Sequence, residues 1–369
     1  MTQRPKERRM QEIVTQVREK QFDYKERDEK KINWKAYDKA QYREMSEMLK
    51  FIRQLVDLAE ERVAARKRPR KEKPFGRPQE IPASDVLKVL LMQTYLCQAN
   101  RVAEGLELLF ADKLGLRTEF SYKEIERGYD DPEVRELIDE MRILTNEPVQ
   151  GVETDFSIDG TGNKTSNKQH YQSDRSKQQA DAAAKKTQSD AFPTGSKPYV
   201  ASVGVIGTKY KLYASWASTS ERGCGERSMF KEVFSDAIDL HPNMNFLLGD
   251  GLYANRPTCD TVGEADVTPV FLPARNVTMK KKKVQEWVDM LTWIADDPQA
   301  FLSVYHMRSI SETGYSMDKR ANPKPIYKRL RRRKDTAVSL RYLCHNIKQL
   351  VYIKYLYKEI QLTFSNKAS

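Results

Sequence analysis

VETDFSIDG, residues 152–160, is the stretch at which this sequence changes from helical to strand-like patterns. Its aromatic and β-branched residues favour an extended chain, and the closing Asp-Gly pair is typical of the turn after a strand. The chain before residue 149 instead shows apolar residues at helical spacing. We therefore expect an α/β domain to begin near this stretch, with Asp159 at the end of its first strand.

Further strand-like segments follow this stretch. Residues 199–206 and 210–217 are rich in Val, Tyr, Ile and Leu, and Gly207-Thr208 between them suits a tight hairpin turn. Short apolar strands are expected at 246–250 and 267–272, each preceded by a helical segment. The first three strands would form an antiparallel meander, whereas strands separated by helices favour parallel addition. This order predicts an α/β mixed sheet flanked by helices and is similar to that of ribonuclease H-like domains.

The region before this domain is expected to be helical. In residues 42–65 and 84–146, apolar residues recur every three or four positions, as on one face of a helix. The expected helix boundaries are Ser84 as an N-cap, Gly115 after a helix over 102–114, a capping box in Ser121-Tyr-Lys-Glu124, and Asp131-Pro132 as N-cap and first helical residue. Further helices are expected across most of 280–319 and over 337–359.

Three segments have compositions that do not predict a packed structure. Residues 1–40 are densely charged without clear apolar periodicity, so we expect a mobile or marginally helical basic arm. Residues 66–78 contain three prolines and a glycine, which exclude a helix and predict a basic linker. This linker could be merely solvated or could lie along a phosphate backbone. Residues 164–197, rich in Lys, Gln, Ser, Asp and Ala, predict a flexible loop.

Composition narrows the class of partner. The chain carries 64 Lys and Arg against 52 Asp and Glu, a net charge of +12. This excess indicates a polyanion, with nucleic acid first and an anionic membrane surface second, although a merely soluble basic protein can show the same balance. No apolar stretch reaches the roughly 18 residues that a membrane span needs, and the N-terminus lacks the apolar core of a secretory signal. We therefore expect a cytoplasmic, nucleoid-associated protein without a membrane partner.

The four cysteines and four histidines are scattered through the chain. Without a Cys-x2-Cys pair, this pattern argues against a disulfide framework or a zinc site and fits a reducing compartment. Carboxylates remain as candidate metal ligands.

Two aspartates each follow a predicted buried strand and precede a glycine. They are Asp159 and Asp250. A strand holds such a carboxylate firmly, and the glycine lets a phosphate or a metal ion approach closely. A single Asp-Gly pair after a strand usually marks only a turn. Asp155 would share a strand face with Asp159, so it is an alternative to Asp159 as a ligand.

The segment YHMRSISETGYSMDK places four polar side chains on one helical face. They are Tyr305, Arg308, Glu312 and Lys319, spaced as Tyr-x2-Arg-x3-Glu-x6-Lys. One stripe would then present a phenol, a guanidinium, a carboxylate and an ammonium to the same cleft. An ordinary amphipathic helix with a polar face gives a similar pattern, and Gly314 within it would weaken the helix by about 1 kcal/mol relative to Ala.

This spacing resembles the signature of one large branch of the DDE transposases encoded by bacterial and archaeal insertion sequences. Ile158-Asp159-Gly160 is similar to the first-aspartate block of that family. Leu248-Gly-Asp250-Gly-Leu-Tyr253 is similar to the second block, including an aromatic residue three positions after the aspartate. The resemblance covers about residues 150–345.

The resemblance implies a ribonuclease H-like domain in which Asp159, Asp250 and Glu312 are the catalytic residues and the metal ligands. Two Mg²⁺ ions, or Mn²⁺ in their place, would be the cofactors. Three carboxylates suffice because Mg²⁺ keeps several of its waters. The implied reaction is metal-dependent cleavage at the element ends, followed by strand transfer into target DNA.

The resemblance also implies the DNA contacts. In the family, residues matching Tyr305, Arg308 and Lys319 contact DNA phosphates near the cut. The partner would be double-stranded DNA, both the terminal inverted repeats of the element and the target, and pairing two ends would suit a homodimer on DNA. Trp287 or Trp293 could stack on a flipped base, although a core role is favoured for both.

The expected division of the chain has four parts. These are a basic arm, helix and linker (1–78), a helical DNA-end-binding domain (79–148), the ribonuclease H-like domain (149–345) and a C-terminal helix and tail (346–369). The interval from Asp250 to Glu312 is too short for the large β-rich insertion of some family members, which leaves open how a cut end is processed. Two alternatives remain, a ribonuclease H-like nuclease of another role and a catalytically inactive DNA-binding derivative. The complete stripe disfavours the first and the intact carboxylates disfavour the second.

Overall fold

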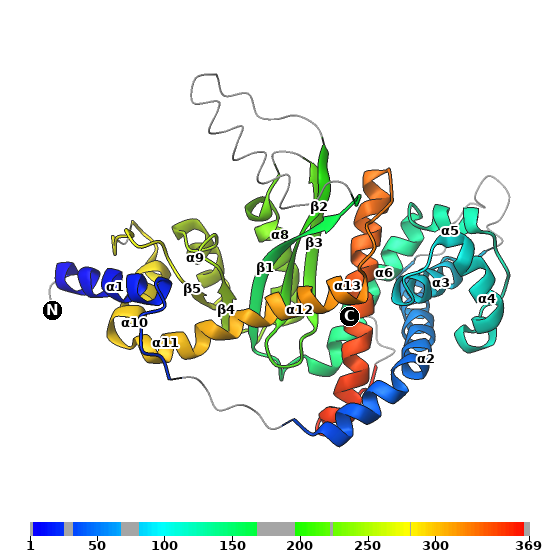
Figure 1. The fold of residues 1–369 in the computed structure, drawn as a ribbon, viewed down its shortest axis with the longest axis horizontal. Helices are drawn as coiled ribbons and strands as arrows, with labels where there is room; N and C mark the ends of the chain where they lie inside the picture. The colour runs from blue at the N-terminus through cyan, green and yellow to red at the C-terminus, as the bar shows by residue number, and fades with distance from the viewer. Residues whose placement is uncertain are drawn as a thin grey trace.

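The computed structural model describes residues 3–25, 32–67, 81–167, 196–221, 224–280 and 282–364. Its centre is a five-stranded mixed sheet with the strand order β3-β2-β1-β4-β5. Figure 1 shows this sheet between two helical regions, with α1 (Gln3–Arg18) at one end of the molecule and α2 to α6 at the other.

The strand directions follow the order of elements along the chain. The strands are β1 (Asp155–Lys164), β2 (Ser196–Gly207), β3 (Tyr213–Glu221), β4 (Phe246–Gly249) and β5 (Thr268–Phe271). β1, β2 and β3 pair antiparallel, whereas β4 pairs parallel to β1 and β5 pairs parallel to β4. The predicted meander with parallel additions is therefore confirmed, and the fold is a ribonuclease H-like mixed sheet flanked by helices.

Two details of the sheet differ from the expectation. β1 does not end at Asp159-Gly160 but continues to Lys164, because its far half pairs with β2 as far as Tyr199. The β2–β3 connection is longer than the tight turn predicted at Gly207-Thr208, since β3 begins only at Tyr213. In this connection the Thr208 amide donates to the Asp155 carbonyl, which ties the turn to the start of β1.

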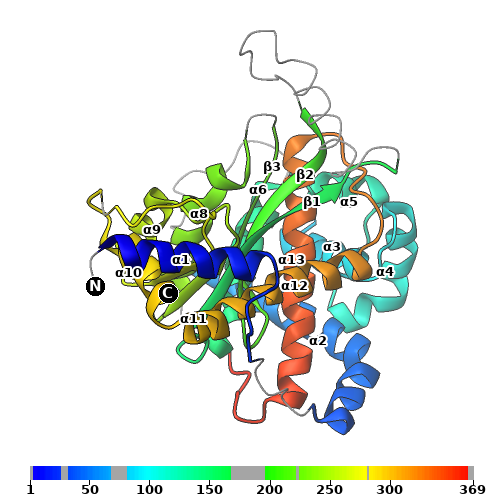
Figure 2. The ribbon, with the colours of Figure 1, turned by 60° about the vertical axis from the view of Figure 1, so that its left-hand side comes forward.

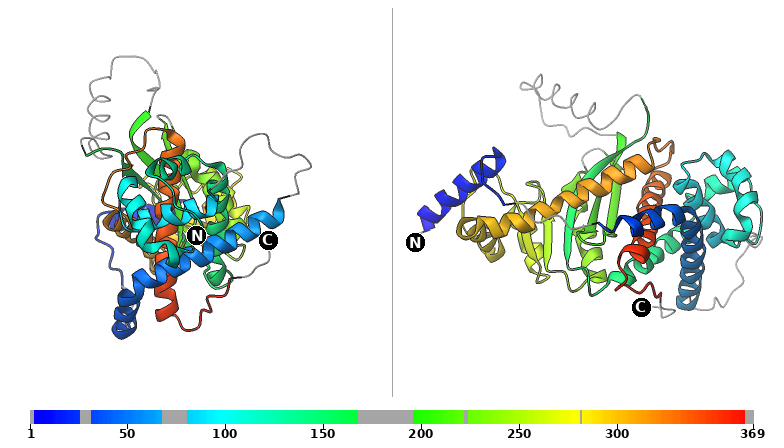
Figure 3. Two further views of the ribbon diagram at one scale, coloured as in Figure 1. Left: turned by 90° about the vertical axis from the view of Figure 1, so that its right-hand side faces the viewer. Right: turned by 60° about the horizontal axis from the view of Figure 1, so that its bottom comes forward.

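Helices cover both faces of the sheet. α8 (Glu226–Leu240) packs against β2 and β3, and α12 (Ser309–Ala321) packs against β1 and β2. α12 runs as a long diagonal from α11 (Pro298–Tyr305) toward α13 (Arg331–Leu356), which is clear in the right view of Figure 3. At the β5 edge lie α9 (Arg256–Gly263) and α10 (Gln285–Asp296).

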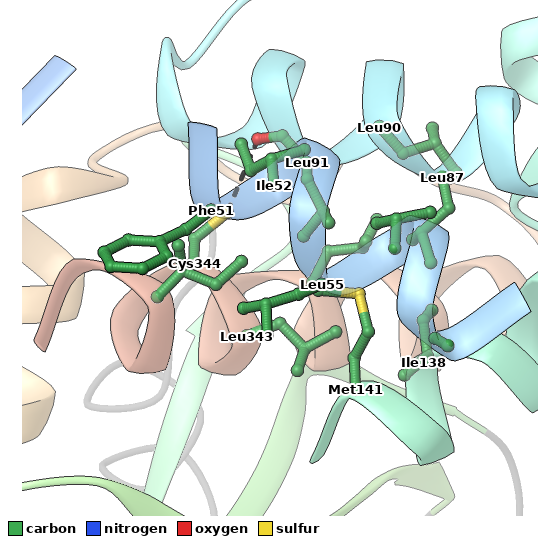
Figure 4. Close-up of a cluster of buried hydrophobic side chains, with 14 of the residues drawn as sticks. Phe51, Ile52, Leu55, Leu87, Leu90, Leu91, Ile138, Met141, Leu343 and Cys344 are labelled. Atoms are coloured by element: carbon green, nitrogen blue, oxygen red, sulfur yellow. Dashed lines mark hydrogen bonds between the residues drawn. The ribbon is translucent and has the colours of Figure 1, made fainter. Parts of the chain in front are cut away.

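The helical region is built around α13. α2 (Trp34–Arg66), α3 (Ala83–Tyr95) and α6 (Pro132–Asn146) all contact it, and Figure 4 shows their apolar side chains meeting, with Leu55, Leu91, Met141 and Leu343 among them. The shorter α4 (Asn100–Leu114) and α5 (Tyr122–Gly128) complete this region. Because α13 continues through residue 345, the boundary expected between 345 and 346 lies inside a helix, and most of the buried apolar residues of this helix belong to this core.

The helix caps test the sequence signals directly. Gly115 ends α4 in the left-handed conformation, the capping box of Ser121 and Glu124 is present, and Asp131 caps α6. The prediction for Ser84 was wrong. α3 begins at Ala83 after Pro82, and the buried Ser84 hydroxyl donates to Glu60 of α2 instead.

The prediction of an unpacked N-terminal arm was also wrong for residues 3–18. They form α1, and Met10, Ile13 and Val14 are buried in the same apolar core as Phe156 and Ile158 of β1. Figure 2 shows α1 lying across α10, and the two helices are in contact. Charged side chains of α1 also take part in the docking, since Lys6 pairs with Asp296 and Arg18 donates to the Leu272 and Pro273 carbonyls.

Two predicted segments fall outside the described residues: the linker over 68–78 and nearly all of the 164–197 loop. Among the helices that are described, none combines the length and the apolar character needed to cross a membrane.

Candidate active site

The first predicted carboxylate, Asp159, sits in the middle of the sheet. The parallel pairing of β1 with β4 matches Asp155 with Phe246 and Ile158 with Gly249. Asp159 and Asp250 are each the next residue after this last pair. The strand register therefore brings the two aspartates to the same level on neighbouring strands, although they are far apart in the sequence.

The side chain of Asp159 lies on the sheet face covered by α12. Residues alternate between faces along a strand, and Ser157, two positions earlier, donates its hydroxyl to the Arg308 carbonyl (3.1 Å) at the start of α12. Phe156 and Ile158 point the other way, into the core that includes α8. Asp155 shares the face of Asp159 but pairs with the first residue of β4, which separates it from Asp250 by the length of that strand. The geometry therefore favours Asp159 over the alternative.

The pKa of Asp159 is raised in the folded protein. This pKa is raised to about 6, chiefly by burial and further by the negative charges of Asp250 and Glu312. The Gly160 amide, which donates to Asp159 (2.8 Å), and the charge of Arg308 oppose this rise. The three predicted carboxylates are thus close enough to influence one another.

The predicted helical stripe is divided by a change of helix type. Tyr305 ends α11, His306–Arg308 form a short 3-10 helix, and Glu312 and Lys319 lie on α12. Tyr305 is buried, at 7% exposure, and the Arg308 guanidinium lies 5.5 Å from the centre of its ring. Arg308 Nη1 also donates to Glu312 Oε1 at 2.8 Å. Tyr305 therefore supports Arg308, and Arg308 in turn holds Glu312.

Lys319 faces the same site from the far end of α12. Its pKa is lowered, mainly by loss of solvent around the ammonium, while the charge of Asp159 acts in the opposite direction. Lys319 thus lies near Asp159, although two helical turns separate it from Glu312.

A close approach to the sheet holds α12 in place. A Cβ atom on Gly314 would come within 2.8 Å of Ile206 Cδ1 and 2.9 Å of the Tyr213 hydroxyl oxygen. The glycine that weakens the helix therefore allows it to lie directly on β2 and β3. One residue later, the Tyr315 hydroxyl donates to the Asp159 carbonyl (2.6 Å) and links the helix to β1.

A buried polar network fixes the end of α12 that carries Lys319. Asp318 accepts a hydrogen bond from the Tyr213 hydroxyl (3.0 Å), and its other oxygen lies 2.7 Å from His345 Nδ1 on α13. His345 Nε2 faces the Lys211 carbonyl (2.8 Å). The sequence alone does not indicate this network, because the network joins residues that are distant in the sequence.

The donor chemistry of the site suits a hard divalent cation, because carboxylate oxygens are the ligands that Mg²⁺ prefers. Near these carboxylates, the buried Tyr253 hydroxyl has no hydrogen-bond partner among the described atoms. Burial first, and then the charges of Glu226, Asp159 and Asp250, raise the pKa of this phenol, which therefore stays neutral. In the described part of the chain, no three Asp, Glu, His or Cys side chains are already arranged as metal ligands. Glu312 would have to leave Arg308 to complete such a set.

Sequence analysis missed one carboxylate at this site. Glu226, the first residue of α8, lies against Gly160, where an added Cβ would come within 2.2 Å of its Cδ. It follows a segment without any Asp-Gly or strand-end pattern, so only the packing of α8 on the sheet places it against Gly160, across β1 from the Asp159 side chain.

The tryptophans considered for base stacking lie in the core. Trp287 is buried and donates its indole N–H to the Thr278 carbonyl (3.0 Å), while Trp293 packs on Phe246 and Phe301. In the basic run of 329–334, Arg331 pairs with Glu221, and Arg333 pairs with Glu126 and Asp130, so ion pairs occupy both of these guanidinium groups.

Comparison with known proteins yields one informative match. The chain is 28% identical over 280 residues to a protein of Archaeoglobus fulgidus described as "Probable transposase for insertion sequence element ISA1214", which covers 75% of this chain and 77% of that protein. No family model and no solved structure matches. The similarity extends well beyond any single motif and supports the transposase family.

Proposed function

We propose that this chain is a DDE transposase that cleaves DNA at the ends of an insertion sequence and joins those ends to target DNA. The observation that carries the proposal is the register of β1 and β4, which sets Asp159 beside Asp250 under the helix that bears Glu312. The similarity to an insertion-sequence transposase over three quarters of the chain gives independent support. Double-stranded DNA is accordingly the proposed partner.

In this proposal the carboxylates of Asp159, Asp250 and Glu312 would hold the divalent metal. When bound, Mg²⁺ or Mn²⁺ would stabilise charge on the attacking and leaving oxygens of an in-line displacement at phosphorus. Asp159 and Asp250 are fixed for this task by backbone amides, since Gly160 N donates to the first (2.8 Å) and Leu252 N to the second (2.8 Å). The Glu312 side chain is 56% exposed, and it would join the two aspartates after release from Arg308.

The basic residues of the stripe would orient the DNA. Arg308 is partly exposed beside Glu312, and its planar guanidinium suits a bidentate grip on a phosphate. Lys319 would add a point charge near Asp159. Tyr305, being buried under Arg308, would act chiefly by fixing the direction of that guanidinium.

The test is strand-specific mapping of cuts. The purified full chain would be incubated with Mg²⁺ and DNA that carries the sequences flanking its own gene, beside Glu312→Gln. We expect cuts at two inverted flanking repeats with the wild type and none with the variant, while both bind the DNA. The matched control is Glu232→Gln, an exposed glutamate on α8 that should cut as the wild type does.

Other outcomes would redirect the proposal. Cuts placed by DNA structure rather than by position would indicate a nuclease of the same fold with another role. Binding without cuts by the wild type would indicate an inactive derivative. Cleavage that survives Glu312→Gln would remove Glu312 from the catalytic set.

A further inference from the structure

A cavity of about 480 Å³ opens beside the proposed catalytic residues. Its floor is the far half of β1, the part that continues past Asp159, and its walls come from the end of α12, the following segment and α13. The lining residues are Gly160, Thr161, Gly162, Asn163, Lys164, Glu226, Lys319, Asn322, Pro323, Lys324 and Arg341. The cavity therefore exists because β1 does not stop at Asp159.

Four cations converge on this cavity, each from a different part of the chain. They are Lys164 on β1, Lys319 on α12, Lys324 in the following segment and Arg341 on α13. Within the described residues none of the four forms an ion pair with a carboxylate, although many other basic side chains of the protein do. Clustered cations repel one another, so this arrangement favours an anion between them.

Hydrogen bonds of Arg341 hold two walls of the cavity together. Its Nη2 donates to the Lys324 carbonyl (2.7 Å) and its Nη1 faces the Asn163 side-chain oxygen (3.4 Å), so one guanidinium joins the β1 wall to the 322–324 segment. Its pKa is lowered, chiefly because burial removes solvent from the charge. A desolvated guanidinium held by two neutral acceptors keeps donors available for an anion.

The cavity continues away from the carboxylates. Asn322, Lys324 and Arg341 also line a second cavity of about 590 Å³, whose other wall is the Gln93–Asn100 turn between α3 and α4. A strand that passes Asp159 would therefore meet the four cations next and then the helical region. Glu226, on the opposite side near Gly160, is the one carboxylate in the lining of the first cavity.

We propose that this cavity binds a phosphodiester of the DNA strand adjacent to the scissile phosphate, with Lys164 and Arg341 as phosphate-binding residues in addition to Lys319. The inference rests on the proposed function, because it takes its anion from the DNA cut beside Asp159. Lys164 is the best probe. Its side chain is exposed, and the fold uses its backbone, which pairs with Tyr199 of β2 and accepts a hydrogen bond from the Ile326 amide.

The experiment measures DNA binding without metal, in EDTA, using the full chain as wild type and as Lys164→Ala. One duplex carries the sequences flanking the gene and a second duplex is unrelated, to represent target DNA. In each, a neutral methylphosphonate replaces one phosphate at a time. Lys50→Ala is the control, because Lys50 is exposed on α2, lines neither cavity and has no ion pair among the described residues.

We expect Lys164→Ala to weaken binding roughly three- to tenfold and to lower the slope of log K against log salt by about 0.7 to 0.9, as for one lost phosphate contact. At one or two phosphate positions, the neutral linkage should weaken wild-type binding but not that of Lys164→Ala. Such positions in the flanking duplex alone would assign the cavity to the element strand, and positions in both duplexes would assign it to target DNA as well.

Two results would overturn the proposal. If every methylphosphonate affects the wild type and Lys164→Ala equally, the cavity does not bind a phosphate, while metal-dependent cleavage by the same preparation would leave the proposed function standing. If the wild type binds neither duplex, the cavity assignment and the proposed function both fail.

Discussion

Arg308 holds Glu312 across one helical turn, with 2.8 Å between Nη1 and Oε1, in the part of the site where Asp159 and Asp250 face α12. The glutamate side chain is 56% exposed and the arginine 27% exposed, so the pair is open to solvent and weak in energy. Binding of a phosphate by Arg308 and of a metal ion by Glu312 would each break this pair. The two events are therefore expected to favour one another.

Replacing Arg308 with Ala should separate these two effects. Without its partner, Glu312 is free to turn toward the aspartates, so Mn²⁺ should bind the DNA-free variant at least as tightly as the wild type. DNA binding should weaken at the same time, with a salt slope about 0.7 to 0.9 smaller, because one phosphate contact is lost. Metal affinity is measured by Mn²⁺ titration and DNA affinity at several salt concentrations. An unchanged salt slope would contradict a phosphate-binding role for Arg308.

Asp159→Asn should change how stability depends on pH. Because the folded-state pKa of Asp159 is raised to about 6, the folded protein binds a proton more tightly than the unfolded chain does. As the pH rises from about 4 to about 6, the free energy of unfolding should therefore fall by up to about 3 kcal/mol. Above pH 6, the contribution of Asp159 should stay level. In Asp159→Asn this contribution disappears, so the variant should be more stable than the wild type at pH 8 without metal.

Urea unfolding at pH 4.5 and pH 8 checks this expectation. Asp260→Asn, at an exposed position outside the site, is the control and should keep the wild-type dependence. Adding Mg²⁺ at pH 8 should raise the stability of the wild type but not of Asp159→Asn, since a ligand that binds the folded state stabilises it. The opposite result would contradict this expectation. If the wild type in EDTA gains stability over Asp159→Asn as the pH rises from 4.5 to 8, the pKa of Asp159 is not raised in the folded protein.

The order of strands could be predicted from the sequence because it depends on local patterns. Alternating or continuous apolar runs locate each strand, and the helices between the later strands require parallel pairing. The positions of Asp250 after β4 and of Glu312 and Lys319 on a helix followed for the same reason. Capping at Ser121 and Asp131 was also predictable, since a cap involves residues only a few positions apart.

Features that depend on distant partners could not be predicted in this way. β1 continues past Asp159 because β2 pairs with it, and no local signal in Gly160-Thr-Gly-Asn-Lys164 indicates that pairing. Gly314 looked like a defect in a helix, and its purpose is visible only beside Tyr213. Glu226 and the cations around Arg341 likewise became neighbours of the site through the packing of helices on the sheet.

Glu226→Gln distinguishes two roles for the carboxylate that the sequence did not reveal. If the Glu226 carboxylate mainly repels DNA phosphates at the edge of the cavity, the neutral variant should bind DNA several-fold more tightly. It should also keep most of its cleavage activity. If it contributes a ligand to the metal site, Mn²⁺ affinity should fall and cleavage should fall with it. Because Glu226 faces Gly160 across the strand from the Asp159 side chain, we expect the first result. Weaker Mn²⁺ binding by the DNA-free variant would contradict it.

Arg62→Met tests the interior of the helical region. Arg62 is 1% exposed on α2, and its guanidinium contacts Glu140 (3.1 Å) and Glu147 (2.6 Å). Its removal leaves the buried Glu140 with Arg66 alone, so the free energy of unfolding should fall by roughly 3 to 5 kcal/mol in urea titrations. Adding Glu140→Met should restore part of this loss, because it removes the fully buried carboxylate, while the less buried Glu147 stays without Arg62. A loss below about 1 kcal/mol in the single variant would show that solvent reaches the glutamate and that the pair contributes little to holding α2 against α6.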